Sequence, residues 1–158
     1  MFFLMMYLLA LGTASIHLLL DRQTRTRERV IDIYLLHLLA IAYGAGGVIA
    51  FIGHKFRGEE TAKSIGWPAG NPFQEEIAFA NLGNGLLGLL CTRLRGNFWT
   101  ATAVGPSVFY LGAAIIHIEE VRKQGNYAIN NIGAILPDLV TPLTVLCLLF
   151  ARREGFAR

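Results

Sequence analysis

Residues 31–53 read IDIYLLHLLAIAYGAGGVIAFIG, a continuous apolar run in which Asp32 and His37 are the only acidic or basic side chains. A helix of about 20 residues crosses the hydrocarbon core of a bilayer. The run is long enough to do so, and the Gly and Ala residues in its second half are typical of contacts between membrane helices. It therefore predicts a transmembrane helix.

Four more apolar runs flank this one, and together they indicate an all-α, polytopic membrane bundle. The chain has 158 residues, of which 54% are apolar, and its mean hydropathy is +0.48. A soluble domain of this size carries more charge. We therefore expect a single transmembrane domain, residues 1–158, with about five spanning helices joined on one side by a loop at 54–71. The predicted helices are residues 2–20, 31–53, 72–91, 98–118 and 131–151.

The basic residues indicate which way the bundle is oriented. Lys and Arg are concentrated in the cytoplasmic segments of membrane proteins. With the N-terminus outside, nine basic residues lie inside and five lie outside. This bias predicts an N-outside, C-inside orientation. The inside set is Arg22, Arg25, Arg27, Arg29, Arg93, Arg95, Arg152, Arg153 and Arg158, and the outside set is Lys55, Arg57, Lys63, Arg122 and Lys123.

The same composition sets the expected location and partners. The first apolar run lacks a positive segment before it and exceeds the usual apolar length of a signal peptide, so we interpret it as a retained helix. A net charge of +3 without a clustered basic face argues against nucleic-acid binding. The expected location is the inner (plasma) membrane of a bacterium, with the lipid bilayer as the main partner. A homo-oligomer or a larger membrane complex is a further possible partner.

Four ionisable residues are predicted to meet at the outer end of the bundle: His54, Glu76, His117 and Asp138. Each lies at or just inside the same end of a different predicted helix. Each also shares a helical face with small residues, which predicts that it faces a neighbouring helix and not lipid. Ionisable groups at this depth usually face the bundle interior and mark a functional site.

This set of side chains is compatible with three kinds of site. Imidazole together with carboxylate suits Zn, Fe or Mn, with Glu120 as a second-shell partner. The same groups could instead bind an organic ligand or carry protons, with Asn131 orienting them. The third interpretation is a polar network that only fixes the helix register. No local metal-binding or catalytic motif is present to choose among them, so enzyme activity is left open.

A second histidine pair lies at the opposite end. His17 is near the inner end of the first predicted helix and His37 is about two turns into the second. Two histidines at one depth could ligate haem. We expect that haem is not bound here, because a histidine more often bonds a neighbouring backbone group or carboxylate. Asp21 and Asp32 are candidate partners.

Part of the chain resembles a bacterial integral-membrane family catalogued as domain of unknown function 6790. The resemblance is carried by SIGWPAGNPFQEEIAFANL at 64–82, NFWTAT at 97–102, LGAAIIH at 111–117, and the segments 126–133 and 138–142. It spans roughly residues 50 to 150. It implies a shared site, although it supplies no activity. The residues that fall on the family pattern are His54, Glu76, His117, Asn131 and Asp138.

The expected function is therefore an integral membrane protein with a polar site near the outer leaflet that binds a metal or a small ligand. The alternative is a non-catalytic subunit or assembly factor of a larger membrane complex. A small transporter is a third hypothesis. The absence of detectable inverted repeats weighs against it, because many transporters contain them.

Overall fold

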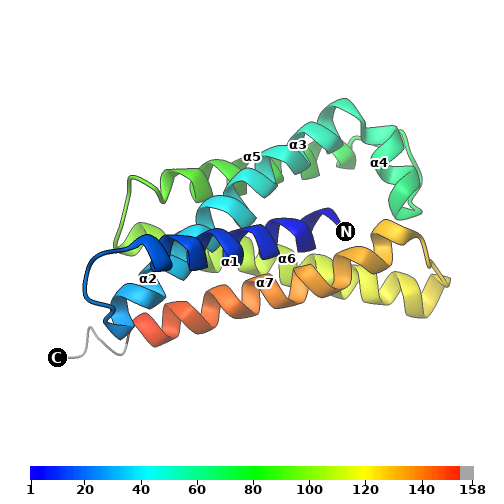
Figure 1. Ribbon diagram of the computed structural model, residues 1–158. Helices are drawn as coiled ribbons and strands as arrows, with labels where there is room; N and C mark the ends of the chain where they lie inside the picture. The colour runs from blue at the N-terminus through cyan, green and yellow to red at the C-terminus, as the bar shows by residue number, and fades with distance from the viewer. Residues whose placement is uncertain (154–158) are drawn as a thin grey trace.

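The computed structural model describes residues 1–153, and over this range it contains helices and no strands, which confirms the all-α prediction (Figure 1). Two of the helical segments, labelled η, are π-helical. In chain order the elements are α1 (Phe2–Leu20), α2 (Arg27–His37), η1 (Leu38–Ala45), α3 (Gly46–Phe56), α4 (Gly58–Ile65), α5 (Phe73–Leu90), α6 (Asn97–Glu119), η2 (Glu120–Gln124) and α7 (Ile129–Arg153).

The long helices lie side by side along one axis, so their connections gather at two ends (Figure 1). One end holds the α1–α2 and α5–α6 connections together with the last turn of α7. The other end holds α4, the start of α5 and the α6–α7 connection. His54 in the last turn of α3, Glu76 in the first turn of α5 and His117 in the last turn of α6 therefore lie at the same end of the bundle.

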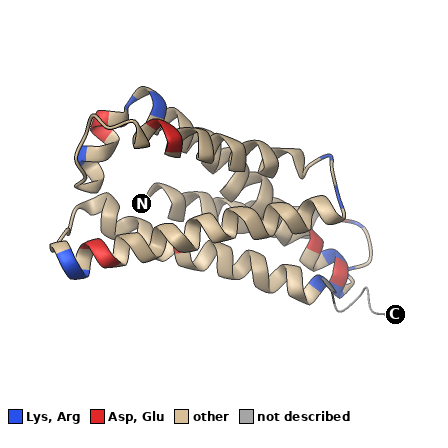
Figure 2. Cartoon of the chain, turned by 180° about the vertical axis from the view of Figure 1, so that it is seen from behind, with Lys and Arg blue, Asp and Glu red and all other residues tan. Residues whose placement is uncertain are grey.

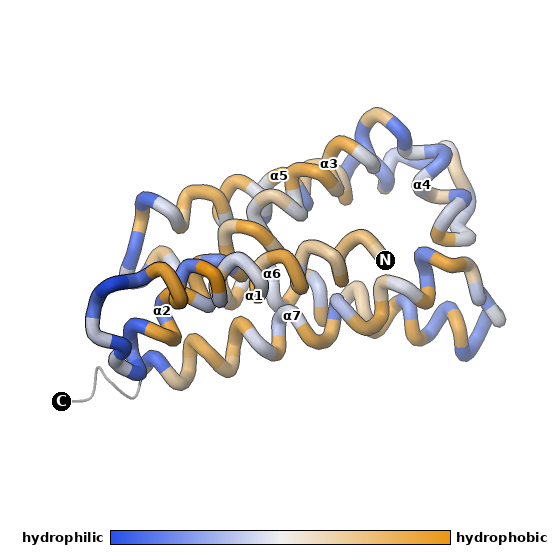
Figure 3. Tube along the Cα trace, viewed as in Figure 1, coloured by the Kyte–Doolittle hydropathy of each residue, from blue (hydrophilic) through white to orange (hydrophobic). Residues whose placement is uncertain are grey.

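Charge and hydropathy follow the same axis. Lys, Arg, Asp and Glu are gathered at the two ends of the helices (Figure 2), and the middle of the long helices is mostly hydrophobic (Figure 3). Within residues 1–153, four helices are long and apolar enough to cross a membrane: Phe2–Leu20, Arg27–Phe56, Asn97–Gln124 and Ile129–Arg152. The fifth expected helix, α5, is formed, but it carries Glu75 and Glu76 in its first turn and is not among these four.

The helix expected over residues 31–53 runs from Arg27 to Phe56 and contains a π-helical segment in its middle. A π-helical turn widens the helix and shifts the phase of every residue that follows it. Within this segment Tyr43 is buried, and its hydroxyl lies 2.8 Å from Ser107 Oγ in α6. The wide turn thus places a polar contact in the middle of the bundle.

Close packing of glycines brings the α3 helix and α5 together. A Cβ atom added at Gly47 would lie 2.7 Å from Asn81 O and 2.9 Å from Gly85 Cα, both of which are backbone atoms. Gly88 approaches Gly44 in the same way. Membrane helices use small residues at such interfaces because they let the backbones touch. The buried face of α5 is therefore Ala78, Asn81, Gly85 and Gly88.

Candidate functional site

The best-defined polar contact at the α4 end joins α6 to α7. His117 Nδ1 lies 2.7 Å from Asn131 Oδ1, and Asn131 Nδ2 donates to the carbonyls of His117 (3.3 Å) and Asn126 (2.9 Å). Because the amide NH₂ is used by two carbonyls, the amide oxygen faces the imidazole and Nδ1–H is the donor. Nε2, the other ring nitrogen of His117, takes no part in this contact. Asn131 is fully buried and His117 is 7% exposed.

Nε2 of His117 faces the carboxylate of Asp138, one helix away. The distance from Nε2 to Asp138 Oδ2 is 4.0 Å, which is longer than a hydrogen bond. Asp138 is 4% exposed, and no hydrogen bond from any residue in 1–153 reaches its carboxylate. Buried carboxylates are normally paired or hydrogen-bonded. At this separation a water can contact both atoms only from one side and cannot lie between them.

A small cavity borders the carboxylate on another side. Asp138 and Tyr110 both line it, and it offers about 10 Å³ to a water centre, which is close to the room that a single water needs. The Tyr110 hydroxyl is fully buried, and no residue in the described range 1–153 is hydrogen-bonded to it. Tyr43, whose ring stacks on Tyr110 at a centroid distance of 5.3 Å, lines the same cavity. Two polar groups without direct partners thus meet one water-sized space.

The segment after α4 covers the imidazole. The Trp67 ring stacks on His117 with centroids 5.4 Å apart and an interplanar angle of 13°. Asn126 holds this segment in place, because its Nδ2 donates to Ile65 O (3.0 Å) and to Glu120 Oε2 (3.2 Å). Glu120 therefore supports the cover through Asn126.

Two of the predicted site residues lie elsewhere. His54 Nδ1 is 2.8 Å from Gln74 Oε1, so its partner is the amide of the first turn of α5. Glu76 is exposed, because α5 packs through the face that contains Ala78, and the small-residue face that Glu76 shares with Gly83 points outward. Its neighbour Glu75 is also exposed and pairs with Lys55.

The structure therefore joins three of the predicted residues, His117, Asn131 and Asp138, and separates His54 and Glu76 from them. Among residues 1–153, no group of three or more His, Cys, Asp or Glu side chains is placed to hold a metal ion. His117 and Asp138 together provide only two side chains that could bind a metal ion. The set of four ligands expected for Zn, Fe or Mn is not assembled in this arrangement.

The second histidine pair is in direct contact. His17 Nδ1 lies 3.0 Å from His37 Nε2, and His37 Nδ1 lies 2.9 Å from Thr13 Oγ1. A hydrogen bond between the two rings leaves no space between these nitrogens for an iron atom. Asp21 and Asp32, which the sequence offered as partners, bond to Arg29 and Arg152 instead.

Sequence reasoning missed Tyr43, Ser107, Trp67 and Asn126 as parts of this region. Helical periodicity could have found Ser107, because Tyr110 lies two turns before His117 on the same helical face and Ser107 lies one further turn back. Tyr43 could not be assigned in this way, because the π-helical segment alters the phase of its helix. Trp67 and Asn126 lie in connections, where helical periodicity gives no information.

Comparison with known proteins adds a family and no activity. A family described as being of unknown function matches residues 1–157. No curated protein and no solved structure matches the chain.

Proposed function

The chain belongs to the family of unknown function 6790, which assigns it no reaction, and we propose a function from the site itself. In this proposal it is a membrane protein that takes up and releases a proton at the His117–Asp138 pair. The observation that carries this proposal is the buried Asp138 carboxylate, to which no residue in 1–153 donates a hydrogen bond and which lies 4.0 Å from His117 Nε2. A proton on the carboxylate would remove its unpaired buried charge, and a proton on His117 Nε2 would place an opposite charge 4.0 Å away from it.

Size favours a proton over a larger ligand. Sites for organic molecules are commonly about 300–1,000 Å³. The cavity beside Asp138 has room for about one water. A metal ion would need more ligands than His117 and Asp138 supply. A proton on Asp138, with one water beside the carboxylate, is what this space accommodates.

Each neighbouring group has a separate task in this proposal. Asn131 fixes the His117 tautomer, so that Nε2 is the nitrogen that gains or loses the proton. Tyr110 offers a hydroxyl to a water beside Asp138. Trp67 limits contact between His117 and bulk water. Exchange with solvent then occurs at the α4 end of the bundle, when the segment that carries Trp67 moves.

Infrared difference spectroscopy of the protein in lipid nanodiscs tests the proposal. Acidification should produce a protonated-carboxyl band that is absent from Asp138→Asn and is shifted in Tyr110→Phe. Asp32→Asn is the matched control, because Asp32 lies near the opposite end and pairs with Arg152 at 2.6 Å. An unchanged band in Asp138→Asn would overturn the proposal.

The membrane placement is part of the proposal and has its own support. The two charged ends and the apolar middle match a bilayer in which four or five helices span (Figure 2). The arginine-rich end then faces the cytoplasm and the α4 end faces outward. A cysteine introduced at Lys63 should react with an impermeant thiol reagent added outside, and a cysteine at Arg25 should not. The reverse pattern would invert the orientation.

A further inference from the structure

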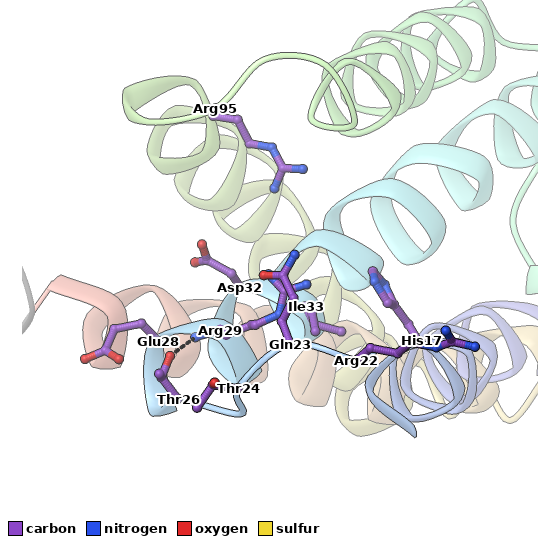
Figure 4. A pocket seen from close by; sticks show the side chains of 10 residues that line it. All are labelled: His17, Arg22, Gln23, Thr24, Thr26, Glu28, Arg29, Asp32, Ile33 and Arg95. Atoms are coloured by element: carbon purple, nitrogen blue, oxygen red, sulfur yellow. Dashed lines mark hydrogen bonds between the residues drawn. The ribbon is translucent and has the colours of Figure 1, made fainter. Parts of the chain in front are cut away.

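A large pocket lies at the arginine-rich end, away from His117 and Asp138. It opens between the α1–α2 connection and Arg95 of the α5–α6 connection, and its volume is about 770 Å³ (Figure 4). This is within the size range of small-molecule sites. The pocket has no part in the proposed proton site.

Of the three arginines that line this pocket, Arg29 pairs with Asp21, and Arg22 and Arg95 are not neutralised by carboxylates. Neither Arg22 nor Arg95 forms an ion pair with an Asp or Glu among residues 1–153. The carboxylate of Asp32 is already bonded to Arg152. Glu28 also lines the pocket, and its side chain extends away from Arg95 (Figure 4). A surplus of positive charge results, and it favours an anion.

Arg95 is held in position by an aromatic ring. Its guanidinium lies over the ring of Trp99 at 4.6 Å from the centroid. Trp99 is fully buried, and its Nε1 donates to Cys91 O at 2.9 Å. A cation–π contact uses the charge of arginine and none of its N–H donors. Those donors therefore stay available to a ligand, on a side chain that is already ordered.

The start of α2 adds donors to the same space. Thr24 and Thr26 line the pocket, and Thr26 Oγ1 accepts from Arg29 N at 3.2 Å, which leaves the Thr26 hydroxyl hydrogen free to donate. The N-terminus of a helix carries partial positive charge and free N–H groups. The Thr26 hydroxyl and the N-terminus of α2 thus supply hydrogen-bond donors in addition to those of the two arginines.

From the cavity, the two uncompensated arginines and the adjoining helix start, we propose that this pocket binds a phosphate group. Arginine binds phosphate through paired N–H donors. Arg22 and Arg95 lie on different sides of the pocket (Figure 4), so either one can hold the phosphate while the other adds positive charge. The group could come from the headgroup of an anionic phospholipid or from a soluble phosphate ester. The pocket lies where the apolar part of the bundle ends (Figure 3), which is the level of lipid headgroups.

Native mass spectrometry of the full chain can separate the two sources. The probes are phosphatidylglycerol, against a phosphatidylcholine background, and glycerol 3-phosphate. We expect one of the two to bind, with at least tenfold weaker binding in Arg22→Gln/Arg95→Gln. The matched control is Arg57→Gln/Arg122→Gln, which removes the same charge at the opposite end and should stay within twofold of the unmodified chain. Binding of phosphatidylglycerol identifies a headgroup site, and binding of glycerol 3-phosphate identifies a soluble ligand.

A measurement on the unmodified chain covers the case in which the double variant does not fold. Bound probe should slow phenylglyoxal modification of Arg22 and Arg95 at least threefold, and should leave Arg122 unaffected. The proposal is overturned if neither probe binds above the phosphatidylcholine background. It is also overturned if the control variant loses binding equally, or if Arg122 is protected as much as Arg22.

Discussion

The Nδ1 atom of His117 lies 2.7 Å from the Oδ1 atom of Asn131, and this contact joins the end of α6 to the start of α7. Both side chains are buried. The contact fixes which imidazole nitrogen carries the hydrogen, and it therefore turns Nε2 toward Asp138. Asn131 is a positioning residue in this account, and it also satisfies the carbonyls of His117 and Asn126.

Replacing Asn131 with Ala should destabilise the bundle. The change leaves a buried imidazole N–H without its acceptor and removes the side-chain donor to Asn126 O, whereas His117 O keeps the backbone N–H of Glu120. A buried polar group without a partner costs about 1–3 kcal/mol. We expect a clearly lower thermal unfolding temperature in detergent. Asn130→Ala, at the exposed neighbouring position, is the control and should change little. Equal unfolding temperatures for the two variants would contradict the assigned contact.

Removing the Trp67 ring should uncover His117. Trp67→Ala takes away the stacked ring without touching the bond between His117 and Asn131. The rate at which diethyl pyrocarbonate modifies His117, followed by peptide mass spectrometry, should rise several-fold. Tyr127→Ala removes an exposed aromatic ring at the same end and should leave the rate unchanged. A rate that does not respond to Trp67→Ala would show that another group covers the imidazole.

The glycine contact between α3 and α5 gives a prediction about stability alone. A Cβ at Gly47 would meet backbone atoms of Asn81 and Gly85 closer than 3.0 Å, so a helix must move. Overpacking of this kind costs about 1–3 kcal/mol. Gly83→Ala is the matched control, because a Cβ there meets nothing within 4 Å and alanine favours helix. Gly47→Ala should lower the unfolding temperature, and Gly83→Ala should keep or raise it.

The α1–α2 connection should respond to acid. The guanidinium of Arg29, with Gln23 N, bonds to Asp21 and holds the pKa of that carboxyl below its ordinary value of 3.8. A carboxyl whose pKa is lower in the folded state stabilises the fold above its unfolded pKa, and that contribution is lost as pH falls through the folded pKa. The stability difference between the unmodified chain and Asp21→Asn should therefore be constant above about pH 5 and shrink below pH 3.8. A difference that grows on acidification would contradict this sign.

Much of the architecture follows from the sequence, because apolar length and charge placement are local properties. The runs at 2–20 and 98–118 are long and uninterrupted, and helices form there. The pairing of His117, Asn131 and Asp138 also follows, since both helices keep regular periodicity over these residues. The sequence could not decide whether α5 contributes Glu76 to the same site. Both of its faces contain small residues, and only three-dimensional packing shows that Gly85 and Gly88 form the contact.

The phosphate pocket and the cover over His117 are also beyond sequence reasoning. Arg22 and Arg95 are more than 70 positions apart, and the pocket exists because two connections meet at one end of the bundle. Trp67 reaches His117 from a connection that has no helical period. Tyr43 depends on a π-helical segment for which a hydrophobic run gives no signal.

Nitrogen-15 NMR of His117 in nanodiscs, recorded across pH in the unmodified chain and in Asp138→Asn, tests the central claim most directly. The account predicts that Nδ1 stays protonated throughout and that Nε2 changes with pH. It also predicts that Asp138→Asn moves the midpoint of the Nε2 change, because the two groups titrate as a coupled pair. An Nε2 signal that follows the same curve in both proteins would contradict a proton shared by His117 and Asp138.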